Sequence, residues 1–311
     1  MAQSKPKRRR RPPSLSPAAR LEMDARMGIA RQDMAIGLAG LFRPVIRGKR
    51  GWLEGLRQQW NGGFLEFAGP ELDSKDMLVL LAIQHLALRE LNAGQAQRVD
   101  GAAAGLIPAE KNRHGNRAVE AQAIGLQTSM AEMCRAIGRD PDDGRAHTSI
   151  RASLKRLQGV VVEARSGEEW ATSNLIRGGA GRGRGAVTVS LNFRLTRAVL
   201  GECSYSRIDV LQLAELPPVA QILVAWLCCW RPGHGKCPSI TIDSLCRHVW
   251  GRGSDAADAP HDALQRRRRQ QIRAALAALP PREWRVAVSA GRCGGTARIE
   301  RLQQSSDVVT G

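Results

Sequence analysis

Aromatic residues are scarce in this chain of 311 residues. Phe, Trp and Tyr make up 4% of it, with four phenylalanines and a single tyrosine, Tyr205. Proteins that stack the bases of single strands or RNA need aromatic side chains, so an RNA-associated basic protein is the weaker reading. A nicking enzyme would need a tyrosine nucleophile beside paired histidines, and Tyr205 has no histidine pair nearby. We therefore expect no nickase and no stacking platform.

Long apolar runs are also missing. No stretch of 18 or more apolar residues occurs, and the longest, residues 219–230, fits a buried helix better than a membrane span. Residues 1–11 are basic, but Pro12, Pro13 and Pro17 stand where a signal peptide would need its apolar segment. We expect a cytoplasmic protein without a membrane partner.

Cysteine occurs seven times, an odd number, and never as a C-x-x-C pair. This usage favours reduced thiols, and zinc modules need closely spaced ligand pairs that Cys228, Cys237 and Cys246 do not form. The run GHGKC, residues 233–237, lacks the first glycine and the hydroxyl residue of a phosphate-binding loop. We expect no metal, no cofactor and no catalytic residue, and hence no enzyme.

Basic residues, by contrast, are abundant. Lys and Arg number 47 against 29 Asp and Glu, which gives a formal net charge of +18. Such a surplus favours a polyanionic partner, most commonly nucleic acid. Residues 1–40 are expected to form a basic disordered arm that contacts phosphate, and residues 303–311 a polar tail. The four consecutive arginines of the arm are Arg8, Arg9, Arg10 and Arg11.

The most informative stretch begins at residue 239. SITI predicts a strand, IDSLCRHVWG a helix capped by Asp243 and ended by Gly251, and DALQRRRRQQIRAALAAL a basic amphipathic helix. In the second helix one apolar stripe recurs at i, i+4 and i+7: Ile272, Leu276 and Leu279. The residues expected to face solvent and read bases are Arg266, Arg267, Gln270 and Arg273. The residues nearer the stripe, whose heads we expect at phosphate, are Arg268 and Arg269.

Two strands joined by a Gly-rich turn follow in EWRVAVSAGRCGGTARIERL, with Arg292 and Arg298 as further phosphate contacts. A helix-turn-helix followed by a basic hairpin is the winged-helix arrangement. It docks the second helix in the major groove of duplex DNA.

An earlier stretch repeats this pattern. SMAEMCRAIG matches the first helix of the pair, and a second apolar stripe lies 122 residues before the other one: Ile150, Leu154 and Leu157. The residues then placed on the opposite, base-reading face are Arg145, Thr148, Arg151 and Lys155. The strands VVVEAR and AVTVSLN, around a loop with Arg182 and Arg184, are predicted to form the first wing. We predict an α+β fold with two tandem winged-helix domains, residues 41–200 and 201–302.

Several runs carry a family resemblance. WLCCWRPGHGKCPSITIDSLCRHVWG and RRRRQQIRAAL, with LFRPVIRG and FLEFAGPE upstream, resemble the RepC-type replication initiators of IncQ-like plasmids. The resemblance implies a monomer or homodimer that binds direct repeats of double-stranded DNA, called iterons, at a plasmid origin. It also implies that the opened origin passes to a plasmid-encoded helicase and primase. A winged-helix transcriptional repressor is the alternative, because groove docking looks the same for both.

Overall fold

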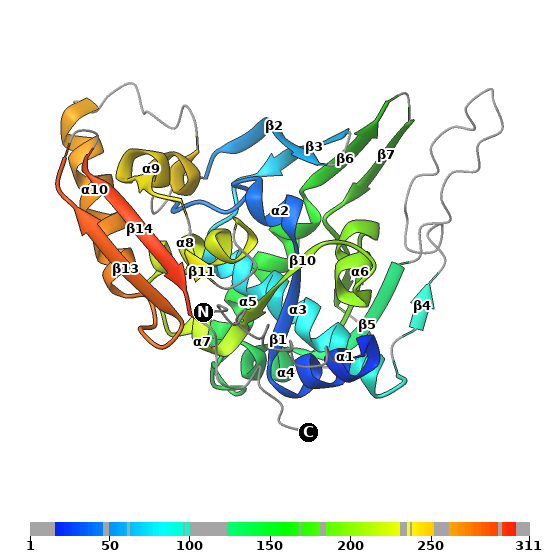
Figure 1. Ribbon diagram of the computed structural model, residues 1–311. Helices are drawn as coiled ribbons and strands as arrows, with labels where there is room; N and C mark the ends of the chain where they lie inside the picture. The colour runs from blue at the N-terminus through cyan, green and yellow to red at the C-terminus, as the bar shows by residue number, and fades with distance from the viewer. Residues whose placement is uncertain are drawn as a thin grey trace, which may run out of the picture.

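The computed structural model describes residues 16–45, 50–60, 63–95, 97–99, 123–167, 169–180, 185–230, 235–236, 238–251, 261–291 and 294–302. Helices and antiparallel strands are mixed along the chain, and the strands pair in four sheets among these residues (Figure 1). Within the same ranges, no helix combines the length and the apolar character needed to cross a membrane.

Residues 16–40 form ordered structure, so the predicted disorder of the 1–40 arm is wrong for this part. Helix α1 (Pro17–Arg26) leads to strand β1 (Ile29–Asp33), which is buried throughout, and to helix α2 (Met34–Leu38). The first residues are basic and rich in proline, but apolar residues begin to recur at Ile29, and Ile36 is fully buried. The rest of the arm, residues 1–15 with Arg8 to Arg11, lies outside the described residues.

Strand β1 pairs antiparallel with β10 (Tyr205–Asp209), far along the chain, and sets Arg31 opposite Arg207. Two like charges facing each other across a ladder repel. Asp24 of α1, which is fully buried, reduces this repulsion by accepting from Arg31 Nε at 2.8 Å and from Arg207 Nε at 2.6 Å. The two-stranded ribbon β1–β10 therefore connects the N-terminal segment to the second half of the chain.

Among the described residues, the first unit consists of four helices and a four-stranded sheet, and three of the helices precede its last strands. These three helices are α3 (Ser74–Asn92), α4 (Met130–Ala136) and α5 (Gly144–Gln158). The strands, in sheet order, are β4 (Gln97–Val99), β5 (Ala123–Ser129), β9 (Ala186–Leu191) and β8 (Ile176–Ala180). Asp73 begins α3 with a reciprocal capping box, and helix α6 (Phe193–Leu200) closes the unit.

A separate sheet lies beside the first unit, at the top of Figure 1. Its strands, in order, are β2 (Trp52–Trp60), β3 (Gly63–Pro70), β6 (Val161–Ser166) and β7 (Glu169–Asn174). The predicted first wing is corrected here, because β6, the strand VVVEAR, pairs with β3 and β7 and not with β9. The partner of β9 is β8. Alternating apolar residues identify a strand, whereas its partner depends on tertiary packing.

The second unit repeats the order of the first. Its helices are α8 (Pro218–Trp230), α9 (Ile242–Trp250) and α10 (His261–Ala277), preceded by the short α7 (Val210–Ala214). Its strands are β11 (Gly235–Lys236), β12 (Ile240–Thr241), β13 (Trp284–Ser289) and β14 (Thr296–Arg301), with β14 paired to the other three. Helices α3 and α8 pack against each other, and the buried apolar core is continuous through both units.

Candidate nucleic-acid interface

Helix α10 has one buried and one exposed side, as the sequence predicts. Its apolar stripe is buried: Ile272, Leu276 and Leu279. The four residues predicted to read bases are exposed: Arg266, Arg267, Gln270 and Arg273. The period of 3.6 residues therefore gives the phase of this helix correctly.

Helix α9 precedes α10 and packs against it. Its N-cap is Thr241 and not Asp243 as predicted: the Thr241 hydroxyl accepts from the Ser244 amide at 3.1 Å. The helix ends at Gly251, whose φ of +82° disfavours other residues. Since the cap is provided by Thr241, the carboxylate of Asp243 is left to face α10.

Arg269 of α10 binds that carboxylate with two hydrogen bonds, from Nε at 2.6 Å and from Nη2 at 2.8 Å. This pair, assisted by a bond from Gln265, lowers the pKa of Asp243 below its usual value. Arg269 is predicted to contact phosphate, and the structure instead places its guanidinium in an ion pair within the protein. A phosphate would have to compete with Asp243 for it.

Arg268 is predicted to keep its head at the surface. In the structure it is 8% exposed, and its guanidinium lies over the ring of Trp250, 5.7 Å from the ring centre. A cation held on an aromatic face is stabilised there. The head of Arg268 therefore lies inside the protein, which corrects the prediction for this residue.

The hairpin β13–β14 follows α10 and confirms the two predicted strands around a Gly-rich turn. Arg273 reaches this turn and donates from Nη2 to the carbonyl oxygen of Gly294 at 2.6 Å. Of the predicted phosphate contacts of the hairpin, Arg298 is exposed on β14, and Arg292 lies outside the described residues. Helix α10 and the hairpin are thus linked through a side chain that the sequence assigns to base reading.

Helix α5 of the first unit has the same phase as α10. Its buried stripe is Ile150, Leu154 and Leu157. The predicted base-reading residues are again exposed: Arg145, Thr148, Arg151 and Lys155. The Thr148 hydroxyl donates to the Gly144 carbonyl oxygen at 2.9 Å, whereas Arg151 has no hydrogen-bond or ion-pair partner among the described residues.

A buried carboxylate anchors α5 to α3. Asp76, fully buried in the first turn of α3, accepts three hydrogen bonds from Arg156 of α5, the shortest at 2.6 Å. Arg50 donates to the same carboxylate at 3.2 Å. This cluster joins residues 26 and 80 positions apart, so no local pattern in the sequence points to it.

The hairpin β8–β9 occupies the place in the first unit that β13–β14 has in the second. Gln158 at the end of α5 donates to the carbonyl oxygen of Gly178 in β8. The loop between the two strands carries Arg182 and Arg184, which lie outside the described residues. Their predicted contact with DNA stays a prediction.

Two tryptophans are exposed on the outer face of the β2–β3–β6–β7 sheet, Trp52 at 63% and Trp170 at 49%. The low aromatic content of the sequence gives no indication that these two tryptophans are exposed. Trp52 pairs with Pro70, while Trp170 shares a row with Phe64 through Arg165. Six residues of extended chain separate Phe64 from Pro70, about 20 Å, so the two tryptophans do not form one continuous stacking surface.

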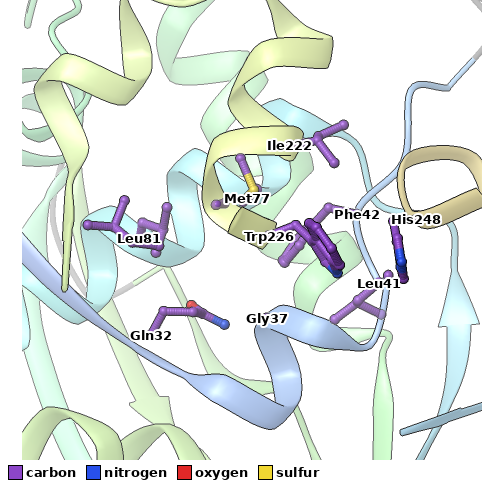
Figure 2. A pocket seen from close by; sticks show the side chains of 12 residues that line it. Gln32, Gly37, Leu41, Phe42, Met77, Leu81, Ile222, Trp226 and His248 are labelled. Carbon is purple, nitrogen blue, oxygen red and sulfur yellow. The ribbon is translucent and has the colours of Figure 1, made fainter. Parts of the chain in front are cut away.

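A small cavity of about 20 Å³ lies between the units, lined by α2, α3, α8 and α9 (Figure 2). Met77, Leu81 and Trp226 make it apolar, and the amide of Gln32 points into it. This volume holds about one water molecule, and none of the residues that line the cavity belongs to α5 or α10. Across the ranges that the structure describes, no cluster of His, Cys, Asp and Glu is arranged for a metal ion.

Comparison with known proteins gives one family and one fold. The sequence matches the family described as Replication protein C (RepC) over residues 25–294. Domains 2 and 3 of RctB superpose with a TM-score of 0.54 at 9% identity, covering 88% of this chain and 99% of that one. Another structure of these domains gives 0.46 at 10% identity, covering 87% and 98%. No curated protein sequence matches the chain significantly. At such low identity the likeness to RctB concerns the fold alone.

Proposed function

The chain belongs to the Replication protein C family, and from this premise we propose that it initiates plasmid replication by binding iterons of double-stranded DNA at the origin. Binding takes place through two tandem winged-helix units, in which α5 and α10 are the recognition helices and the hairpins β8–β9 and β13–β14 are the wings. The bound protein promotes opening of the origin, and a plasmid-encoded helicase and primase are then loaded. These last partners rest on the family resemblance.

One observation carries the proposal: the same construction occurs twice. In each unit a long helix supports a capped helix, a turn and a second helix whose buried stripe leaves a row of cationic and polar side chains exposed. A hairpin follows the second helix in each unit: β8 pairs with β9 in the first and β13 with β14 in the second. Arginine in such a row can donate two hydrogen bonds to guanine, and glutamine can do so to adenine.

The ribbon between the units supports binding to two grooves. Arg31 lies opposite Arg207 in an antiparallel pair, and each strand is followed by a short helix capped by an aspartate, Asp33 or Asp209. This local two-fold relation suits recognition helices that enter successive major grooves from one side of the duplex. Paired helix-turn-helix units place such contacts one helical turn, about 34 to 36 Å, apart.

This role requires no catalytic group, metal or cofactor in the chain. Binding draws on the net charge of +18 for phosphate and on the exposed helix faces for sequence. Winged-helix repressors bind DNA in the same way, so the test has to measure replication and not binding alone.

The test is origin complementation. A plasmid that carries only the cognate origin should be maintained in cells that supply this chain together with its helicase and primase. A matched control supplies the chain with Arg145, Arg151, Arg266 and Arg267 replaced by alanine, which should abolish maintenance. Loss of the plasmid in the presence of the unaltered chain, with binding to the origin intact, would contradict the initiator role and leave a repressor.

A further inference from the structure

Three elements of the second unit meet at one joint, which we define as Asp243, Arg269, Arg273 and Gly294. Asp243 comes from α9, the two arginines from α10 and Gly294 from the turn of the hairpin. Arg269 bridges to α9 through its two bonds to Asp243, and Arg273 bridges to the hairpin through Gly294. One face of α10 is thereby connected to the elements before and after it.

The turn of the hairpin also packs directly on α10. Gly294 has a φ of +75°, and a Cβ added there would lie 2.9 Å from Cδ of Arg269. The aliphatic part of Arg269 therefore fills the space in which a side chain at residue 294 would stand. Since Asp243 holds the guanidinium of Arg269, it also fixes the position of the stem against which the turn rests.

The two arginines are both cations but bind different kinds of partner. The charge of Arg269 is balanced by the carboxylate of Asp243, while Arg273 donates to a neutral carbonyl oxygen. In the first unit, the counterpart of Arg273 is Arg151, which has no hydrogen-bond partner within the described ranges and does not connect α5 to β8–β9. The link between recognition helix and hairpin is therefore built differently in the two units.

We propose that Arg269 and Arg273 are positioning residues that hold the second wing against α10, so that the wing and the helix reach the DNA in a fixed relation. Arg273 then acts through the wing and not by reading a base. This inference rests on the proposed function for its DNA readout, although the joint itself can be tested without DNA.

The test without DNA uses amide hydrogen exchange of β13 and β14. Arg269→Met keeps an unbranched apolar stem but loses both bonds to Asp243, and we expect exchange in the hairpin to become about tenfold faster. The matched control is Arg285→Ala, which removes an exposed pair with Glu300 in the same hairpin and should leave exchange nearly unchanged. If Arg269→Met and Arg285→Ala have the same effect on the exchange rates of the hairpin amides, the proposed positioning role of Arg269 is wrong.

The test with DNA compares two footprints on the origin duplex. In Arg269→Met and Arg273→Ala, hydroxyl-radical protection by the second wing should weaken, while protection of guanine N7 under α10 persists and affinity falls about tenfold. Loss of N7 protection at one base in Arg273→Ala, with the wing footprint intact, would show base reading and overturn the proposal. If the unaltered chain protects no origin DNA, the proposed function is wrong instead. The hydrogen-exchange experiment then still shows whether Arg269 holds the hairpin against α10.

Discussion

Helices α5 and α10 share one pattern of buried and exposed residues but are anchored in different ways. The anchor of α5 is Asp76, which is fully buried on α3 and binds Arg156 and Arg50. The anchor of α10 is Asp243, which lies on α9 near the surface, with 21% of its side chain exposed. Both helices also bury an apolar stripe, so the two differ in the ion pair that orients them: a buried one for α5 and a partly solvated one for α10.

These two anchors imply a rigid first unit and an adjustable second unit. Removing one partner of a buried pair leaves an uncompensated charge in the interior, while a solvated pair can exchange its partner for water. We expect the first unit to present a fixed recognition helix. The second unit should present a helix and a wing whose relation responds to the state of Asp243 and Arg269.

The largest effect on the free energy of unfolding should come from replacing the anchoring aspartates, Asp76 and Asp243, one at a time by alanine. Asp76→Ala should lower the free energy of unfolding by about 3 kcal/mol, because Arg156 and Arg50 lose a buried carboxylate and α3 loses its capping box. Asp243→Ala should lower it by less than about 1 kcal/mol. Urea unfolding of both variants measures this contrast, and equal losses would contradict the assignment of a buried and a solvated anchor.

The next effect concerns Arg151, the counterpart of Arg273 in the first unit, which has no partner among the residues that the structure describes. Arg151→Ala should reduce iteron binding by about tenfold and narrow the gap to non-specific DNA, since one bidentate contact to guanine contributes about 1 to 3 kcal/mol of discrimination. Arg151→Lys keeps the charge but loses the planar fork, so specificity should still fall while the salt dependence stays nearly unchanged. Titrations of iteron and scrambled duplexes at several salt concentrations separate these effects. Equal loss on both duplexes would mean that Arg151 contacts phosphate only.

The smallest effect should be a loss of stability in acid. It should arise from helix α3 and not from α8. Burial lowers the pKa of His85 on α3, whereas α8 contains no histidine. The unfolded chain then binds a proton more readily than the folded one, so stability should decrease as the pH falls below about 6.5, the usual value for histidine. His85→Gln should flatten this part of the profile in unfolding experiments from pH 8 to pH 5. An unchanged slope would show that other groups cause the decrease.

Periodicity predicted helices α5 and α10 and the phase of each, because a stripe at i, i+4 and i+7 has only one way to face a core. It did not predict the anchors. Asp76 meets Arg156 across 80 positions, and Asp243 became available for Arg269 only because Thr241 took the cap. Such contacts depend on how the helices pack, which the local sequence does not specify.

The N-terminal segment was missed for a different reason. It follows directly on basic, proline-rich residues that dominate the local composition, although the spacing of Arg31 and Asp33 recurs in Arg207 and Asp209, each time before a short apolar helix. This repeat is a signal that could have identified the ribbon. The partner of β9 had no comparable signal, since β8 reads IRGGA, a Gly-rich sequence that is unusual for a strand.

The central claim, that two units place one helix each in duplex DNA, is tested most directly by the footprint of a single monomer on one iteron. Two recognition helices predict protection of successive major grooves on one face, about two helical turns or roughly 20 base pairs. Arg145→Ala with Arg151→Ala should remove protection from one half of the site, and Arg266→Ala with Gln270→Ala from the other half. Protection of a single groove, or loss of the same half by both pairs of substitutions, would contradict the claim.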